Sequence, residues 1–502
     1  MDKCTFERGA GVLCHISSLP GKYGIGSLGA EAYAFVDFLE RAKAKYWQIL
    51  PLVQTGYGDS PYQSVCCNSG NPYFIDLEKL AEEGLLDEEE LKEAEMPFGR
   101  IDYGQLYRRR YETLRRAYAR FNIKDEKFAE FVSSGLFDDY ALFMSFKSIY
   151  GGTFRDWPSA YKFRQTAVID EFRTNIYRGE YCFWQFVQYE FFRQWKALKA
   201  YANSRGIKLI GDLPLYMAAD SSDVWARPEL FLLNGDLNPV DVAGVPPDYF
   251  SATGQLWGNP LYDWNKMRED GYAWWTERIR RAYELYDIIR LDHFRGFDRY
   301  YAIPAGSPTA ESGEWRQSPG TELFERAERA LGGLKIIAED LGIIDDGVVR
   351  LRAQTGFPGM KILLFAFDGD ENNAYLPKNI AKNSVTYSGT HDNDTAFGFV
   401  SGMTESAFSD FRRRLRAALR GEGVSYPFVT RRDSVRALIR CALATRSDIC
   451  IIPVQDILGL DNSSRMNVPG TPSGNWQFRL AEIPGRQQAA IFRAAVRASG
   501  RL

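Results

Sequence analysis

The chain has 502 residues, of which 45% are hydrophobic and 25% charged, the proportions of an ordinary soluble globular protein. Its 62 basic and 65 acidic residues leave a net charge of −3, which excludes a basic surface for nucleic acid or a polybasic segment for a membrane. No apolar signal segment or bilayer-length run occurs, and the seven cysteines are scattered without a C-x-x-C spacing. A cytoplasmic protein without a disulfide framework or zinc site is expected.

Eight short apolar segments, most of them rich in Ile, Leu or Val, are typical of strands buried on both faces of a parallel sheet. Helical patterns lie between many of them. This alternation indicates a parallel sheet, and eight such units predict an α/β fold, one closed (β/α)8 TIM barrel spanning residues 1–502. The expected strands are 11–15, 46–52, 207–212, 288–292, 334–339, 360–365, 385–390 and 449–453, and the expected helices include 31–43, 184–198, 272–286, 321–331, 348–354 and 489–498.

Two long interruptions break the alternation. The first, residues 53–206, contains charged, helix-prone stretches at 77–95 and 107–121 and predicts a mainly helical subdomain, 60–180, inserted after the second strand. The second, 213–268 after the third strand, is rich in Gly, Pro, Asp and aromatic residues with little periodicity, and is expected to be an irregular loop or lid. Both are interpreted as elaborations of one catalytic domain.

Three of the apolar segments lead into a carboxylate, at Asp292, Glu339 and Asp392. Parallel α/β barrels gather their chemistry at the carboxyl ends of strands, and glycoside chemistry depends on paired carboxylates. Arg290 shares a strand face with Asp292 and favours its ionised form, which predicts a low pKa for this acid. The apolar residues 336–338 before Glu339 favour a raised pKa. Asp292 is therefore predicted to be the nucleophile and Glu339 the acid/base, about 5 Å apart.

Structural explanations compete for some of these acids. The pair of Arg290 and Asp292 could merely close a layer of the barrel. Asp340 follows Glu339 directly, so strand alternation turns it to the other face, where a structural role is expected. Asp298, in the loop beyond Asp292, is expected to form a turn or a cap.

Two of the three histidines, His293 and His391, stand directly beside candidate acids, an arrangement that packing alone explains poorly. As neutral hydrogen-bond donors they could hold sugar hydroxyls next to the reacting carbon. No H-E-x-x-H or comparable ligand spacing is present, so a metal is not expected.

Segments spread over almost the whole chain resemble, in order, those of the amylomaltase family, the 4-α-glucanotransferases of the α-amylase clan. The three acids lie in Arg290–Gly296, Ile337–Gly342 and Gly389–Thr395, which are similar to the signature segments of the family. Further similar segments are Ser18–Gly26, Ser60–Ser64, Gly70–Pro72, Gly211–Tyr216, Asp220–Trp225, Arg465–Thr471 and Gly474–Trp476.

The resemblance implies that an α-1,4-glucan is cleaved and that the glucanosyl unit passes to the 4-hydroxyl of another glucose or glucan. It implies that Asp292 is the nucleophile, Glu339 the acid/base and Asp392 a third carboxylate that grips two hydroxyls of the sugar at the cleavage point. The implied substrates are maltooligosaccharides and maltodextrins, with glycogen and amylose as further candidates and glucose as an acceptor. No cofactor, metal, nucleic acid or membrane partner is implied.

The same resemblance implies a set of substrate-binding residues. One group would surround the sugar at the cleavage point, and a second would hold a sugar on the acceptor side by stacking and hydrogen bonding. A third would belong to a lid that keeps water from the glycosyl-enzyme, although a surface loop with incidental aromatic residues is the alternative. The first group is Arg290, Asp212, His293 and His391, the second is Tyr62 and Ser60, the third is Tyr249, Phe250, Gln255 and Trp257, and Asn467 completes the set.

Two segments depart from the family pattern. Val65–Asn68 replaces the Phe, Ser and Ala residues that usually follow the acceptor motif, and Gln477–Arg479 stands where a second Trp is usual. The first departure could alter acceptor-side contacts. Two rival functions stay open: an α-glucan hydrolase that uses the same acids with water as second substrate, and a non-catalytic glucan-binding or scaffold protein, which should lack one of the acids.

Overall fold

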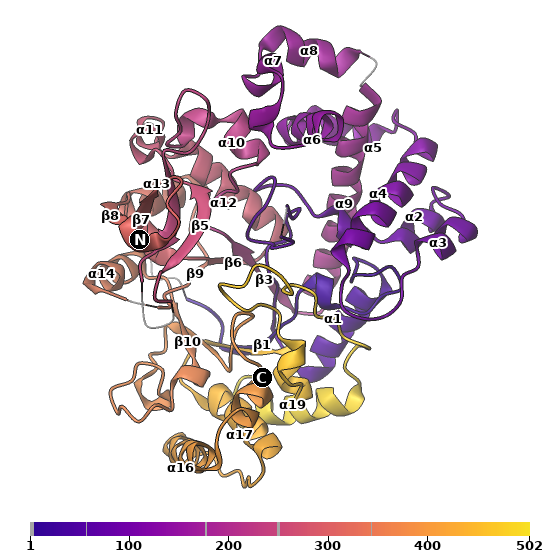
Figure 1. The fold of residues 1–502 in the computed structure, drawn as a ribbon. Helices are drawn as coiled ribbons and strands as arrows, with labels where there is room; N and C mark the ends of the chain where they lie inside the picture. Colours follow the sequence, from indigo (N-terminus) through magenta and orange to yellow (C-terminus); the bar gives the residue numbers. More distant parts are fainter. Residues whose placement is uncertain (1–4, 57, 176–177, 248–250, 343) are drawn as a thin grey trace.

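The computed structural model describes residues 5–56, 58–175, 178–247, 251–342 and 344–502. Within these residues, eight parallel strands close into a barrel in the order β1-β12-β11-β10-β9-β6-β3-β2 (Figure 1). No helix in the same ranges is long and apolar enough to cross a membrane. The barrel strands are β1 (Gly9–Leu13), β2 (Tyr46–Gln48), β3 (Lys208–Leu213), β6 (Ile288–Leu291), β9 (Ile336–Ala338), β10 (Gly359–Ile362), β11 (Ser384–Tyr387) and β12 (Ile449–Pro453).

The predicted (β/α)8 barrel is confirmed, with a strand at each of the eight expected places. Several strands are shorter than expected, because the pairing stops before the apolar run does. The run 360–365, for example, continues after β10 as the 3-10 turn Leu363–Phe365. The register places Asp212 opposite Arg290 and Leu291 opposite Ala338. Residues 292 and 339, which follow Leu291 and Ala338, therefore leave the barrel side by side at its carboxyl rim.

Amphipathic helices cover the outside of the barrel. In α13 (Thr321–Leu331), for example, Leu323, Phe324 and Ala327 are buried, whereas acidic and basic residues face outward. The expected helices are found at their places, the stripe 184–198 as part of a longer α9. The other covering helices are α1 (Ala30–Ala42), α9 (Arg178–Ser204), α12 (Ala273–Leu285), α14 (Asp346–Thr355), α15 (Ala396–Ser401), α16 (Glu405–Gly421), α17 (Arg431–Ala444), α18 (Val454–Leu458) and α19 (Arg486–Ala498).

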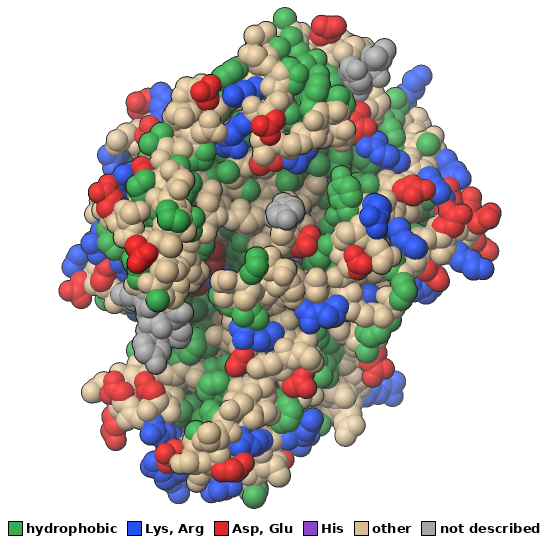
Figure 2. Space-filling view, viewed as in Figure 1, with side chains coloured by type: hydrophobic (Ala, Val, Ile, Leu, Met, Phe, Trp, Pro, Cys, Tyr) green, Lys and Arg blue, Asp and Glu red, His purple; other side chains and the backbone are tan. Residues whose placement is uncertain are grey.

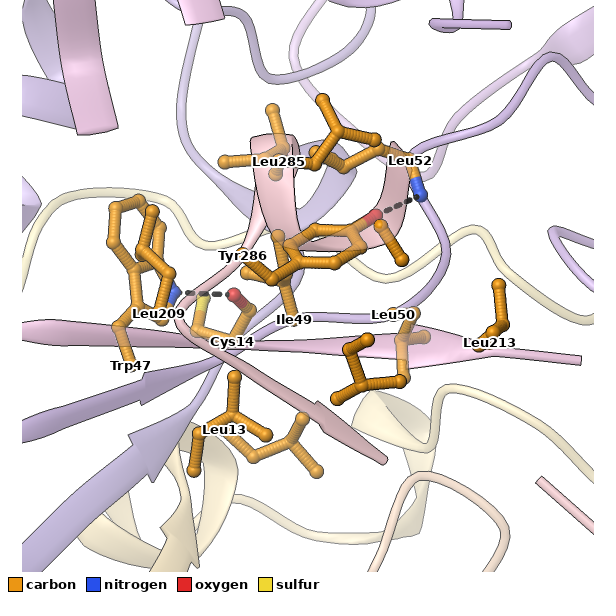
Figure 3. Close-up of a cluster of buried hydrophobic side chains, with 14 of the residues drawn as sticks. Leu13, Cys14, Trp47, Ile49, Leu50, Leu52, Leu209, Leu213, Leu285 and Tyr286 are labelled. Carbon is orange, nitrogen blue, oxygen red and sulfur yellow. Dashed lines mark hydrogen bonds between the residues drawn. The ribbon is translucent and has the colours of Figure 1, made fainter. Parts of the chain in front are cut away.

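The core between the barrel and its helices is made of buried apolar and aromatic side chains, and several of its polar groups are hydrogen-bonded. Figure 3 shows Trp47 of β2 beside Cys14, whose carbonyl accepts a 2.8 Å hydrogen bond from the indole nitrogen. The Tyr286 hydroxyl accepts from the backbone nitrogen of Leu52. Gly211 in β3 leaves room for this tyrosine, because a Cβ atom there would lie 2.1 Å from the ring. This core fixes the neighbouring strands β2 and β3, from which the long insertions depart.

The region between β2 and β3 is mainly helical. The helix-prone stretch 77–95 forms two short helices, because Asp87 begins a new helix with a reciprocal capping box. Helix α9 then runs back along the whole region to β3. The helices that precede α9 are α2 (Leu77–Glu82), α3 (Glu88–Ala94), α4 (Tyr103–Arg120), α5 (Glu126–Ser133), α6 (Asp138–Tyr150), α7 (Ser159–Lys162) and α8 (Thr166–Thr174).

The region 213–268 is more regular than the expected irregular loop. Besides α10 (Ser222–Ala226) and α11 (Trp264–Glu269), it contains the strands β4 (Asp241–Val245) and β5 (Gln255–Pro260). Strands β4 and β5 pair with each other, and β4 also pairs with a strand beyond β6, which local periodicity could not reveal. Among the described residues, these strands form an antiparallel sheet of order β5-β4-β7-β8 with β7 (Arg299–Pro304) and β8 (Glu314–Gln317).

Candidate active site

A groove of about 2,660 Å³ crosses the carboxyl rim of the barrel. The space-filling view shows this face hollowed near its middle, between the part that carries α6 and α10 and the part that carries α16 and α17 (Figure 2). The groove brings together residues from the loops that follow β2, β3, β6, β9, β10, β11 and β12, which are far apart in the sequence. Predicted site residues that line it are Ser60, Tyr62, Gln255, Trp257, Arg290, Asp292, His293, Glu339, His391, Asp392 and Asn467.

Glu339 is held at the bottom of the groove by backbone groups. It follows β9, and its carboxyl oxygens accept hydrogen bonds from the backbone nitrogens of His293 at 2.8 Å and Leu341 at 3.0 Å. Burial raises the pKa of Glu339 to about 8, the charge of Asp292 adds to this, and Arg290 and the backbone bonds oppose it. The predicted raised pKa of this acid is therefore found, and at neutral pH the carboxyl carries a proton to donate.

Asp292 is paired with a buried guanidinium. Its Oδ1 lies 3.0 Å from Nη1 of Arg290, and the same nitrogen lies 2.6 Å from Oδ2 of Asp212. Arg290 and Asp212 are almost completely buried, whereas 28% of the Asp292 side chain is open to the groove. The Arg290 guanidinium thus faces two carboxyl groups, and the more exposed of the two, Asp292, is accessible to a substrate in the groove.

The predicted low pKa of Asp292 is not found. Burial raises its pKa and the Asp392 carboxylate adds to this, although Arg290 and His391 act in the opposite direction. The interpretation of the sequence counted the guanidinium and left out the depth of the groove and the second carboxylate. The ion pair still distinguishes Asp292 from Glu339, whose bonds come from backbone nitrogens.

Asp212 lies one layer below the groove, although it was expected to line the subsite itself. Its Oδ2 accepts from Arg290 and, at 2.8 Å, from the Tyr62 hydroxyl, whereas Oδ1 has no hydrogen-bond partner among the described residues. Burial raises the pKa of Asp212 to about 7, with Arg290 opposing and Asp292 adding to it. Asp212 can therefore act on a substrate only through Arg290 and Tyr62.

Tyr62 joins the two sides of the groove. Its hydroxyl gives its proton to Asp212, so the contact of 3.0 Å with Nε2 of His391 requires that nitrogen to carry a proton and donate. The two rings are stacked, with centroids 5.4 Å apart and an angle of 12° between planes. Burial lowers the pKa of His391, so the ring is a neutral donor.

Asp392 lies in the segment between β11 and α15. Its Oδ1 accepts a 2.7 Å hydrogen bond from the amide of Asn467, and its Oδ2 lies 3.3 Å from Nε2 of His391. Some 40% of the side chain is exposed to the groove. Asn467, which was predicted only as a substrate contact, thus also orients this third carboxylate.

The base of the expected lid packs against the histidine after Asp292. Trp257 meets the His293 ring edge-on, with centroids 4.8 Å apart, and its indole nitrogen donates to the side chain of Gln255 at 3.2 Å. Burial lowers the pKa of His293 to about 4, so it is neutral. Ser60, which also lines the groove, accepts from the backbone nitrogen of Tyr62. Tyr249 and Phe250 lie outside the described residues.

The acids that were expected to be structural have structural contacts. Asp340 is buried and accepts a 2.7 Å hydrogen bond from the backbone nitrogen of Met360. Asp298 lies 3.5 Å from the Arg299 side chain and borders Gly347, at which a Cβ atom would lie 2.3 Å from the carboxylate. Within the described ranges, no three His, Cys, Asp or Glu side chains are grouped so that they could hold a metal ion.

Three residues at or near the site were given no role from the sequence, although Trp476 belongs to one of the segments that resemble the family. Phe365, at the end of an apolar strand run, is 39% exposed and lines the groove. Trp476 lies against both Tyr62 and His391, with ring centroids 5.7 and 6.0 Å away. Asp456 is buried behind Asp392 and contacts both ends of the segment that carries it. The exposure of an aromatic residue at a strand end, or a contact between two loops, cannot be predicted from the local sequence.

Comparison with known proteins adds independent observations. A family model described as 4-alpha-glucanotransferase matches residues 14–484. A 4-alpha-glucanotransferase of Clostridium butyricum is 46% identical over 478 residues, covering 93% of this chain and 95% of the relative, and one of Thermus thermophilus is 44% identical over 510 residues, covering 99% of each. The structure of an amylomaltase from Streptococcus agalactiae in complex with acarbose has a TM-score of 0.92 at 38% identity, covering 99% of this chain and 100% of that one.

Proposed function

The chain belongs to the 4-alpha-glucanotransferase family, and from that premise we propose that it acts on maltodextrins by a retaining double displacement through Asp292 and Glu339. The observation that carries the proposal is the difference between the two acids. Glu339 is bound by backbone nitrogens and has a pKa of about 8, whereas Asp292 is ion-paired with Arg290 at 3.0 Å. Two carboxyls in contrasting environments at one site are the usual basis for assigning acid and nucleophile.

In the first half of the reaction, Glu339 gives its proton to the glycosidic oxygen while that oxygen leaves the anomeric carbon. An Asp292 oxygen forms a bond to the same carbon, which produces a covalent glycosyl-enzyme and releases a shortened glucan. In the second half, the 4-hydroxyl of an acceptor attacks the anomeric carbon, its proton passes to Glu339, and Asp292 is freed. Two inversions retain the α configuration. The separation of about 5 Å between the two carboxyls stays a prediction of this scheme.

The remaining groups at the bottom of the groove are assigned to the sugar at the cleavage point. Asp392, oriented by Asn467 and exposed to the groove, would accept bonds from two sugar hydroxyls. His293 and His391 are neutral and can donate to such hydroxyls. These contacts accelerate the reaction only if they strengthen as the ring flattens toward the transition state.

A transferase must keep water from its glycosyl-enzyme until a sugar arrives. Gln255 and Trp257 stand at the foot of the loop that leads from β4 to β5, and both line the groove. This placement supports a lid in that loop. We assign Tyr249 and Phe250 to the lid on the basis of the sequence, and Tyr62 and Ser60 to the binding of an acceptor sugar.

The size of the groove supports an oligosaccharide substrate. Its volume of about 2,660 Å³ exceeds the roughly 300–1,000 Å³ typical of sites for small molecules. Maltooligosaccharides and maltodextrins fit this description, with glucose as an acceptor and glycogen or amylose as larger substrates. A cytoplasmic location is supported by the six cysteines of the described ranges, which are all buried and unpaired.

Incubation with maltotriose tests the proposal against its closest rival, an α-glucan hydrolase. Transfer should produce glucose and longer oligomers while the number of reducing ends stays constant. Hydrolysis should make reducing ends rise in step with glucose. No reaction at all would favour a glucan-binding protein, although the presence of all three carboxylates in one groove argues against it.

A further inference from the structure

The segment that carries Asp392 lacks regular structure. It begins after Tyr387, the last residue of β11, and ends where α15 begins at Ala396. Inside it, Asn393 accepts from the backbone nitrogen and the hydroxyl of Thr390, a local turn that does not connect the segment to the barrel. The position of Asp392 relative to Asp292 must therefore be fixed by contacts from elsewhere.

Asp456, on α18 after β12, makes contacts at both ends of this segment. Its Oδ2 accepts a 2.6 Å hydrogen bond from the Ser388 hydroxyl, and its Oδ1 accepts a 2.7 Å bond from the backbone nitrogen of Ala396. Ser388 is the first residue after β11 and Ala396 the first of α15. The Asp456 carboxylate therefore links the two ends of the loop through one hydrogen bond to each end.

Asp456 cannot touch a glucan. Only 2% of it is exposed, and it borders a separate cavity of about 30 Å³ behind His391 rather than the groove. Further contacts with the segment come from Asn462, whose side chain accepts from the backbone nitrogen of Thr395, and from residues that line the groove. Among the latter, the backbone nitrogen of Leu364 donates to the carbonyl of Ser388. Arg465 pairs with Asp394 and donates to the carbonyl of Asp392, and Asn467 donates to the Asp392 side chain.

We propose that Asp456 is a positioning residue that holds Asp392 in register with Asp292 by binding both ends of the intervening segment. Both partners are donors, so the ionised carboxylate is the form that accepts both bonds. Burial raises the pKa of Asp456 to about 6, with both hydrogen bonds opposing, and the group is ionised at neutral pH. Replacing the carboxylate by an amide turns one of the two acceptors into a donor, so either the Ser388 hydroxyl or the Ala396 N–H is left buried without an acceptor.

The inference rests on the proposed function, because it assigns Asp392 a task in the transition state. A displacement of about 1 Å at a reacting group can reduce a rate about 100-fold, whereas contacts of the rest of the glucan with the groove would be unaffected. The expected signature is therefore a loss in kcat with KM preserved. Mere loss of stability would also lower the apparent kcat with KM unchanged, because fewer molecules are active, but it would lower the folded fraction in proportion. The kcat is therefore expressed per folded enzyme, and the inference requires a loss that remains after this normalisation.

The test compares kcat and KM for maltotriose among the full-length wild type, Asp456→Asn, Ser388→Ala and Asp433→Asn. Asp433 is a matched control, because it also accepts from a hydroxyl and a backbone nitrogen, both of Thr430, but on the exposed end of α17. We expect kcat to fall at least tenfold in Asp456→Asn and about threefold in Ser388→Ala, with KM within threefold. Asp433→Asn should stay within twofold of wild type.

Circular dichroism and melting curves accompany the kinetics. If Asp456→Asn does not fold, Ser388→Ala decides: a folded variant with reduced kcat supports the inference, and one with wild-type kcat overturns it. If the wild type is active and Asp456→Asn has the same kcat, the inference is also overturned. A wild type that fails to disproportionate maltotriose overturns the proposed function instead, so the two failures are distinguishable.

Discussion

The active groove has two halves that are built differently. The strand half consists of Asp212, Arg290, Asp292 and Glu339, which lie at the ends of the neighbouring strands β3, β6 and β9. The loop half consists of His391, Asp392 and Asn467, which lie on segments held together by side-chain hydrogen bonds.

The two halves differ in burial and in charge. Asp212 and Arg290 are almost fully buried, and burial shifts the pKa of every acid in the strand half upward. Asp392 in the loop half is 40% exposed, and its position depends on the amide of Asn467. In the proposed mechanism, the strand half would control where protons reside, whereas the loop half would control how the sugar is bound.

The largest expected effect is in the strand half. Glu339→Gln keeps the shape of the side chain but removes its proton, so kcat for maltotriose should fall by a factor on the order of 10²–10⁴. Asp340→Asn is the control, because this neighbouring acid is buried and its carboxylate accepts a hydrogen bond from the backbone nitrogen of Met360. The substitution should lower stability but leave the kcat of the folded enzyme unchanged. A Glu339→Gln enzyme that turns over maltotriose normally means that the acid/base is another residue.

The raised pKa of Glu339 predicts a pH dependence with a definite sign. The protonated carboxyl is the active form, so kcat/KM should fall about tenfold per pH unit above a pKa of about 8. Between its ordinary value of 4.5 and about 8, the folded state holds a proton that the unfolded state lacks, so this group destabilises the fold as pH rises. Glu339→Gln should therefore raise the melting temperature at pH 8.5 but not at pH 4.5. A flat activity profile up to pH 9.5 would argue against the assignment.

A smaller loss is expected in the loop half. Asn467→Ala removes the 2.7 Å bond that orients Asp392, and a hydrogen bond to a charged group is worth about 1.5–3 kcal/mol, so kcat should fall about tenfold to 100-fold. The pH profile should keep its wild-type shape, because no proton-holding group of the strand half is touched. Asn383→Ala, which removes an exposed amide bonded to the Gly356 carbonyl, is the control and should have no effect. A shifted profile in Asn467→Ala would show that the halves are not separate.

The two halves also differ in how well their structure could be predicted from the sequence. Apolar runs that lead into Asp292 and Glu339 are local signals, and they were sufficient to predict the barrel and to bring both acids to one rim. The burial of Asp212 below the groove, and the balance that raises the pKa of Asp292, depend on neighbours from other strands.

The loop half and the second sheet were less accessible to prediction. Asp456 stands 64 positions after Asp392, and nothing in its local sequence shows that α18 lies behind that acid. Strand β4 pairs with its neighbour β5 but also with β7, which begins at Arg299, so this second partner lies outside any local window. Long-range pairing of polar strands carries no periodic signal of its own.

The proposed lid should affect the fate of the intermediate more than its formation. Tyr249→Ala should lower the ratio of transfer to hydrolysis severalfold, because water reaches the glycosyl-enzyme more easily, while total cleavage of maltotriose changes little. Both products are measured together as oligomers and reducing ends. Phe163→Ala, at an exposed aromatic residue outside the groove, is the control. An unchanged ratio would remove the lid from the proposal.

Tyr62 tests whether the halves are coupled, since its hydroxyl donates to Asp212 and accepts from His391. Tyr62→Phe should lower kcat about threefold to tenfold, which corresponds to the roughly 1 kcal/mol net contribution of one ordinary hydrogen bond. It should also raise the pKa of Asp212 further by removing a donor. Tyr201→Phe, which loses a 2.7 Å bond to Asp37 at the surface, is the control.

The decisive comparison is the double variant with Asn467→Ala. For independent sites, the loss in kcat of the double variant equals the product of the two single losses within about twofold. If the Tyr62 hydroxyl couples the strand half to Asp392, the measured loss should differ from this product by more than about twofold. If the two losses in kcat multiply, the residues that hold protons and the residues that bind the sugar act independently of each other. In that case the stacked rings of Tyr62 and His391 serve only to close the floor of the groove.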